Sequence, residues 1–208
     1  FSLAFVASLI FPAAASAACV LPAPGQSAVV PLGSEDGPQA LVHTPEGYDP
    51  AQGPVPLVFL LHGSGSTGAA MLRDSKLGET ADAHGFILVA PDAGIPLERG
   101  YAWNIPGVPT VAGEVPGPEE RDDVEYIASL ADALAEGGCA DPARVYVTGL
   151  SGGGRMTSWL GCVESTRYGG GEAGTVVASR IYVDGGHSWV VDNEAMWAFF
   201  ARYRREAR

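Results

Sequence analysis

The chain has 208 residues, with 24 acidic residues against 12 Lys and Arg, which gives a formal net charge of -12. Such an excess of negative charge argues against nucleic acid or an anionic membrane surface as a partner. The length and the 47% hydrophobic content suit one globular domain with a sizeable core.

The first 17 residues, FSLAFVASLIFPAAASA, form an apolar stretch that Pro12 breaks and small residues follow. This pattern resembles the hydrophobic region and cleavage site of a secretory signal, and it is too short to span a bilayer comfortably. We therefore expect a remnant of a signal peptide at 1–17, a single domain at 18–208, and a secreted protein, extracellular or periplasmic.

Strand-like and helix-like segments alternate along the rest of the chain. Strands are predicted at 27–31, 39–44, 55–61, 85–91, 143–149 and 175–183, and helices at 67–83, 119–136, 152–162 and from about 193 onward. The run VPLVFLL at 55–61 is apolar throughout, which is typical of a strand buried on both faces of a parallel sheet. A proline- and glycine-rich loop is expected at 93–118. The alternation predicts an α/β fold with a mainly parallel central sheet flanked by helices.

Three cysteines, Cys19, Cys139 and Cys162, would be able to form disulfides after export. Cys139 precedes a predicted strand that rises roughly 20 Å. The helix that follows returns roughly 16 Å by Cys162. The sequence therefore predicts a Cys139–Cys162 disulfide and leaves Cys19 unpaired. The cysteines are not spaced as zinc ligands, so we expect no metal or other cofactor.

The segment VYVTGLSGGGRM places a G-x-S-x-G motif between a strand and a helix. A serine there sits on a sharp turn with strained backbone angles, and glycines two residues to either side relieve the crowding. The positive end of the helix dipole behind the turn favours developing negative charge. We therefore predict that Ser151 is a catalytic nucleophile.

A second motif, HGSG at residues 62–65, follows the apolar strand 55–61. In a hydrolase of this pattern, that loop supplies one backbone amide to an oxyanion hole, and the residue after the nucleophile supplies the other. Ser64 and Gly152 are the predicted donors, with Gly63 as an alternative to Ser64. His62 is interpreted as a structural residue that holds this loop.

The chain has four histidines, which are the candidates for the general base. His43 is interpreted as a sheet or surface residue, and His84 lies at the end of a predicted helix. His187 follows a predicted strand, lies in the glycine-flanked GGHSW segment and precedes the last helix. Because this position fits the chain order serine, acid, histidine, we predict His187 as the general base.

Taken together, FLLHGSG, VAPDAG, YAWNIPG, RDDVEYI, DPARVYVTGLSGGGRM and GGHSW resemble a secreted α/β-hydrolase family. This family comprises polyhydroxybutyrate depolymerases and feruloyl and acetylxylan esterases, and the resemblance covers roughly residues 28–162 and 175–203. It implies a serine carboxylic ester hydrolase that works through an acyl-enzyme, with Ser151 as nucleophile and His187 as base. Trp103 is implied near the acyl or aryl site, and Tyr101 is a further candidate substrate contact in the same loop.

The substrate implied by the resemblance is an ester, either a polyester or a plant cell-wall ester, and the motifs do not choose between them. Asp122 and Asp123, in the RDDV segment, are interpreted as structural residues at a helix start.

The chain departs from the family pattern after the nucleophile helix. Family members carry two further strands there, and the catalytic aspartate follows the second. Residues 163–174 contain no aspartate, only Glu164 and Glu172. We therefore expect a fold shortened by about two strands, with the predicted strand 175–183 pairing directly beside the nucleophile strand.

No residue matches the family's acid by position. Asp184, Asp192 and the two glutamates are open as substitutes, and so is the absence of any acid. Two alternatives follow for the function, namely a catalytically impaired or inactive hydrolase-like protein that lacks the triad acid, and a peptidase on the same fold.

Overall fold

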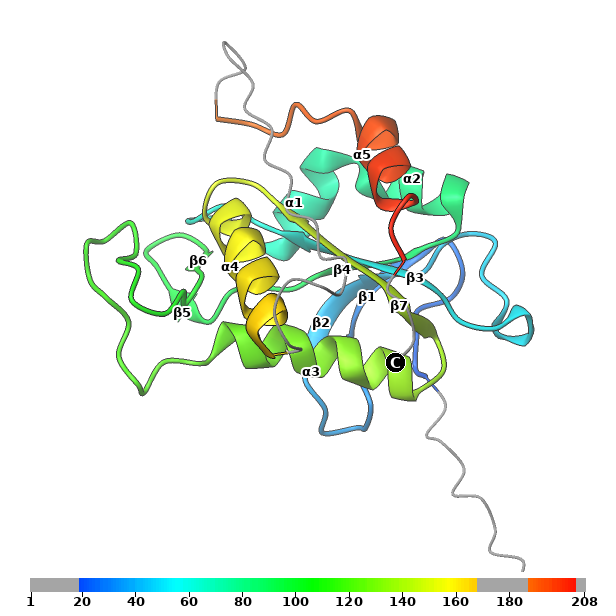
Figure 1. Ribbon diagram of the computed structural model, residues 1–208, viewed down its shortest axis with the longest axis horizontal. Helices are drawn as coiled ribbons and strands as arrows, with labels where there is room; N and C mark the ends of the chain where they lie inside the picture. Colours follow the sequence, from blue (N-terminus) through cyan, green and yellow to red (C-terminus); the bar gives the residue numbers. More distant parts are fainter. Residues whose placement is uncertain (1–18, 168–186, 205–208) are drawn as a thin grey trace, which may run out of the picture.

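The computed structural model describes residues 19–167 and 187–204 (Figure 1). Its central sheet has the strand order β1-β2-β4-β3-β7. The bounds are β1 Ser27–Pro31, β2 Gln39–His43, β3 Val55–Leu61, β4 Ile87–Ala90 and β7 Ala140–Gly149. Strand β3 pairs in parallel with β4 and β7, whereas β2 pairs antiparallel with β1 and β4. The central strands are thus parallel, as predicted, and a two-residue hairpin, β5 Ile95–Pro96 and β6 Tyr101–Ala102, lies within the long loop.

Helices cover both faces of the sheet (Figure 1). Their bounds are α1 Gly68–Ser75, α2 Leu77–His84, α3 Asp123–Glu136, α4 Gly152–Arg167 and α5 Asn193–Phe200, besides a short 3-10 helix at Pro50–Gln52. In Figure 1, α3 and α4 lie on one side of the sheet, and α1, α2 and α5 lie on the other. This layering confirms the predicted α/β fold with a central sheet between helices.

The apolar side chains of β3 pack into the core on both faces of the sheet. Leu57, Phe59 and Leu61 join residues of α3 and Met156 of α4 in one buried cluster. Val58 and Leu60 join residues of α1, α2 and α5 in a second cluster. Successive side chains of a strand point to opposite faces, so a strand covered on both faces is apolar at every position.

Two predicted helices differ from the observed ones. The segment predicted as one helix at 67–83 is two helices, because Lys76 between them adopts a left-handed conformation with φ of 54°. The helix predicted from 119 begins at Asp123, where the carboxylate of Asp122 accepts hydrogen bonds from the amides of Val124 and Glu125. Such a side-chain cap satisfies free N–H groups and fixes the start of a helix.

The disulfide predicted between Cys139 and Cys162 is wrong in this structure, because Cys139 is bonded to Cys19. Cys139 is buried directly before β7 in the cluster that contains Leu57 and Phe59, and Cys19 packs against that cluster. The segment before β1 runs past the end of α3, where a Cβ on Gly137 would lie 3.2 Å from the Cβ of Cys19. Helix α4 also continues beyond Cys162 to Arg167. The side chain of Cys162 lies outside the described residues.

We expect Cys19→Ser to lower the free energy of unfolding by about 2–5 kcal/mol, because the bond closes a loop of 120 residues and restricts the unfolded chain. Denaturant unfolding of the oxidised protein measures this change. Cys162→Ser is the matched control and should have a much smaller effect. A large loss in Cys162→Ser with none in Cys19→Ser would restore the pairing predicted from the sequence.

Candidate active site

Ser151 lies on a tight turn between β7 and α4. Its φ is 54°, and Lys76 is the other non-glycine residue of the described chain with a positive φ. The amide of Leu150 donates to the carbonyl of Leu61 at 3.1 Å, and the amide of Gly153 donates back to the carbonyl of Leu150 at 2.9 Å. The side chain of Ser151 is exposed. A serine held in this conformation costs about 1–3 kcal/mol, and such strain clusters at functional sites.

The glycines of the G-x-S-x-G motif are required by close backbone packing. A Cβ on Gly149 would lie 2.6 Å from the carbonyl carbon of Gly153 and 2.8 Å from the carbonyl oxygen of Leu61. A Cβ on Gly153 would lie 2.2 Å from that same Leu61 oxygen. The turn that presents Ser151 therefore packs directly on the end of β3.

The two predicted oxyanion donors lie side by side. A Cβ on Gly152 would lie 2.6 Å from the Oγ of Ser64 and 3.3 Å from its backbone nitrogen. A Cβ on Gly63 would lie 3.4 Å from the Cβ of Ser151. The loop after β3 thus meets the nucleophile turn at the N-terminus of α4. Two amides and a helix N-terminus beside one serine are a suitable environment for a developing oxyanion, and the assignment of Ser64 and Gly152 as its donors stays a prediction.

His62 holds the loop of Ser64 in place. It is fully buried, its Nδ1 donates to the carbonyl of Gly63 at 2.8 Å, and its Nε2 accepts from the amide of Ala93 at 3.0 Å. This pattern requires the neutral ring. Burial lowers the pKa of His62 below its ordinary value, although the Gly63 carbonyl and the charges of Asp92 and Asp123 oppose the shift. These contacts fit the structural role predicted for His62.

Trp103 and Tyr101, the predicted substrate contacts, lie beside the same loop. Trp103 is buried, and its Nε1 donates to the carbonyl of His62 at 2.8 Å. Its ring lines a small pocket together with Ser64 and Gly152. Tyr101 contacts the loop through its backbone, since its carbonyl accepts from Gly65 at 2.9 Å and its amide donates to Ser66 at 3.0 Å. Contact of either side chain with a substrate stays a prediction.

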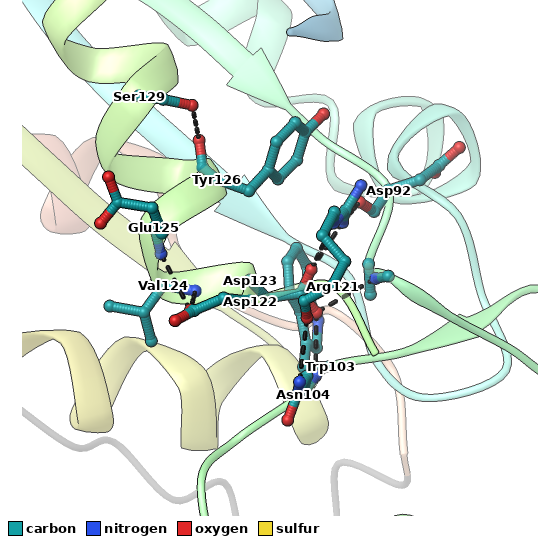
Figure 2. A network of polar contacts seen from close by, with 12 residues as sticks. Asp92, Trp103, Asn104, Arg121, Asp122, Asp123, Val124, Glu125, Tyr126 and Ser129 are labelled. Carbon is teal, nitrogen blue, oxygen red and sulfur yellow. Dashed lines mark hydrogen bonds and ion pairs between the residues drawn. The ribbon is translucent and has the colours of Figure 1, made fainter. Parts of the chain in front are cut away.

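A buried carboxylate anchors the loop that carries Trp103 (Figure 2). Asp123 is fully buried and accepts hydrogen bonds from the amides of Gly94 and Asn104 and from the Nε of Arg121. Arg121 in turn donates to the carbonyl of Asp92 at 2.7 Å. Because a buried charge is stable only when it is paired and hydrogen-bonded, this network fixes both ends of the segment 94–104. It also fits the structural role predicted for Asp123.

The structure describes His187 but places it in no hydrogen bond with Ser151. His187 is exposed and lies shortly before α5. Within the described part of the chain, no hydrogen bond joins the Oγ of Ser151 to a histidine or a carboxylate. The predicted strand 175–183, Asp184 and Glu172 lie outside the described residues, as does the side chain of Glu164. The role of His187 as the general base therefore stays a prediction.

Asp192, one of the candidate substitutes for the triad acid, caps a helix. Its carboxylate accepts from the amide of Ala195 at 3.0 Å and so caps the N-terminus of α5. An aspartate at this position stabilises a helix by satisfying a free N–H group. This contact was not foreseen, although an Asp shortly before an apolar helical stretch is a known signal for a cap.

The two other histidines hold structural elements together. His43 bonds to Ser27 at 2.9 Å and to Asp82 at 3.0 Å, which ties β1 and β2 to α2. This serine, histidine and aspartate form a chain, but Ser27 starts an edge strand and lies on no strained turn. His84 at the end of α2 bonds to Glu194 of α5 at 2.6 Å. Neither histidine is connected to Ser151 by a contact among the described residues.

The described residues contain no group of three metal-ligating side chains and no helix long and apolar enough to cross a membrane.

No protein-family model matches the chain. Among curated proteins, poly(3-hydroxyalkanoate) depolymerase C of Paucimonas lemoignei is 35% identical over 124 residues, which cover 58% of this chain and 27% of that protein. Feruloyl esterase B of Neurospora crassa is 30% identical over 126 residues, covering 61% and 40% respectively. These relatives match the group predicted from the motifs. The chain spans between about a quarter and two-fifths of their length.

Among solved structures, an acetyl xylan esterase from Aspergillus awamori superposes with a TM-score of 0.52 at 20% identity, covering 68% of this chain and 48% of that one. At this identity the likeness shows the fold alone. The described residues therefore form part of an α/β-hydrolase fold, as the motifs predicted.

Proposed function

We propose, from the premise that this chain is related to poly(3-hydroxyalkanoate) depolymerases and feruloyl esterases, that it is a serine carboxylic ester hydrolase. The observation that carries the proposal is the turn at Ser151. It combines an exposed hydroxyl, a φ of 54°, the N-terminus of α4 and the adjoining loop of Ser64. Strain of this kind is maintained against a cost in stability, and here it presents a nucleophile.

In the proposed reaction, the Oγ of Ser151 attacks the ester carbonyl carbon while His187 takes the hydroxyl proton. The amides of Ser64 and Gly152 donate to the resulting oxyanion. His187 then gives the proton to the departing alcohol, and the acyl group stays on Ser151. His187 then takes a proton from a water molecule, which attacks the acyl carbon of the acyl-enzyme. The tetrahedral intermediate collapses with cleavage of the bond to the Oγ of Ser151, which receives the proton from His187, and the acid is released.

A catalytic triad contains an acid as its third residue, beside the serine and the histidine. An acid that orients the histidine is worth about 10⁴ in kcat in the well-studied serine protease, and catalysis without it still exceeds the rate in water. We assign no residue to this role here. A site that works as a serine-histidine pair would have a low turnover, which is the impaired alternative.

The proposed substrate is an ester of a polyester or of the plant cell wall. The names of two relatives, a poly(3-hydroxyalkanoate) depolymerase and a feruloyl esterase, support this proposal. Secretion is part of the proposal and has two supports, the signal-like residues 1–17 and the Cys19–Cys139 disulfide, since disulfides persist in oxidising compartments.

Hydrolysis of p-nitrophenyl butyrate by the mature chain tests the proposal. We expect measurable turnover that falls by about 10²–10⁴ in His187→Ala, because general base catalysis contributes about this factor. His84→Asn is the matched control and should keep the activity. The corresponding p-nitroanilide should be cleaved far more slowly, and comparable cleavage would favour the peptidase. Equal background rates of p-nitrophenyl butyrate hydrolysis in the wild type, His187→Ala and His84→Asn would mean that the chain is not an esterase.

A further inference from the structure

Arg155 lies one helical turn after the nucleophile. Its amide donates to the carbonyl of Ser151 at 3.0 Å, which is the first i to i−4 hydrogen bond beyond the turn. Side chains of a helix lean toward its N-terminus and cover the preceding turn. The side chain of Arg155 is exposed and therefore extends over the surface that presents Ser151.

The pocket beside the nucleophile has one ionisable residue among the described residues that line it, and that residue is Arg155. The remaining lining is mostly apolar and includes Trp103, Ile105, Val108 and Val111. Ser64 and Gly152, the predicted oxyanion donors, also line this pocket. One cation, an apolar surface and the two predicted oxyanion donors therefore line the same small pocket.

Arg155 has no ion-pair partner among the residues that the structure describes. By contrast, Arg121 and Arg144 form ion pairs with Asp123 and Asp141. Arg155 also lies at the end of the first turn of α4, where the helix dipole disfavours a positive charge. The chain has twice as many acidic as basic residues, so a cation in this position that pairs with no described carboxylate points to an anionic ligand.

We propose that Arg155 binds a carboxylate of the substrate, so that the site prefers esters with a free carboxylate over their neutral counterparts. The guanidinium group matches a carboxylate with two parallel hydrogen bonds and stays charged at every pH of interest. The ester carbonyl would lie at the Ser64 and Gly152 amides. The carboxylate would lie beside Arg155, with the connecting methylene groups along the apolar lining. The inference rests on the proposed esterase function and names its substrate class.

Two pairs of esters test the inference, because the carboxylate can belong to the acyl part or to the alcohol part. The first pair is mono-p-nitrophenyl glutarate and its methyl ester. The second pair is the linear dimer of 3-hydroxybutyrate and its methyl ester. For each pair, the ratio of kcat/KM for the anionic ester to that for the neutral ester is measured in the wild type, Arg155→Met, Arg155→Lys and Arg73→Met.

We expect a ratio above one in at least one pair, and a decrease of about 10-fold or more in Arg155→Met, since hydrogen bonds to charged groups contribute this much. Arg155→Lys should retain part of the preference, and Arg73→Met, on the outer surface of α1, should retain all of it. Turnover of p-nitrophenyl butyrate should be unchanged in Arg73→Met, and in the Arg155 variants it is the reference that separates a general loss of activity from a loss of the preference. The preference should also weaken in high salt, which screens an exposed charge.

Failure of the inference is distinct from failure of the esterase function. If p-nitrophenyl butyrate is hydrolysed and both ratios are the same in the wild type and Arg155→Met, the inference is wrong and the function stands. If no ester is hydrolysed, the inference is tested by binding. NMR titration of the Ser151→Ala chain compares the affinity for monomethyl glutarate, the anionic probe, with that for dimethyl glutarate, the neutral probe. Selective binding of the anionic probe that is lost in Ser151→Ala/Arg155→Met supports the inference, and equal binding of the two probes overturns it.

Discussion

Replacement of Ser151 by alanine is expected to lower kcat for p-nitrophenyl butyrate by at least about 10⁴, to the rate without nucleophilic catalysis. The variant keeps the turn between β7 and α4 but has no hydroxyl to form the acyl-enzyme. Initial rates at saturating substrate measure the loss. A rate within 10-fold of the wild type would assign the hydrolysis to another residue.

Ser151→Gly separates the strain of the turn from its chemistry. Glycine adopts a positive φ without the steric cost that serine and alanine bear at 54°. We therefore expect Ser151→Gly to be as inactive as Ser151→Ala but about 1 kcal/mol more stable in denaturant unfolding. Equal stability of the two variants would mean that the strained turn relaxes in solution.

Gly153→Ala is expected to destabilise the protein by more than about 3 kcal/mol and to abolish activity. The added Cβ would lie 2.2 Å from the carbonyl oxygen of Leu61 and 2.7 Å from that of His62. Both atoms belong to the backbone of β3 and the loop after it, so relief requires α4 and its turn to move off the sheet. Overpacking that shifts the backbone is among the largest effects of single substitutions. Denaturant unfolding and the ester assay measure the two losses.

The neighbouring Gly154→Ala is the matched control. Its Cβ would meet the carbonyl oxygen of Gly149 at 3.3 Å, a contact that a small adjustment relieves. Alanine also favours the helix over glycine by about 1 kcal/mol, so the net change in stability should be within about 1 kcal/mol of zero. Equal destabilisation by the two substitutions would contradict the close packing of Gly153 on β3.

The sequence predicted the elements whose pattern is local and strong. Strand β3 was predicted with its observed bounds because seven consecutive apolar residues fit a strand covered on both faces. The strand-Ser151-helix turn was predicted because glycine spacing carries a direct steric meaning. Boundaries set by single side chains were missed, such as the break at Lys76, since lysine has no preference for a positive φ.

Long-range partners were not predictable from local pattern. The Cys19–Cys139 bond joins residues 120 apart and depends on the path of the segment before β1. The anchoring role of Asp123 was predicted only as a helix start, because its partners Gly94 and Asn104 come from another segment. The placement of Arg155 beside the predicted oxyanion donors likewise depends on the pocket, which α4 forms with the loop of Trp103.

The central claim is that Ser151 is the nucleophile of an esterase site. Treatment of the protein with phenylmethylsulfonyl fluoride, followed by peptide mass spectrometry, tests it most directly. We predict one sulfonyl adduct on the peptide that contains Ser151, none in Ser151→Ala, and loss of ester hydrolysis in parallel with labelling. An unlabelled chain that still hydrolyses esters, or an adduct on Ser27 or Ser64 in place of Ser151, would contradict the account.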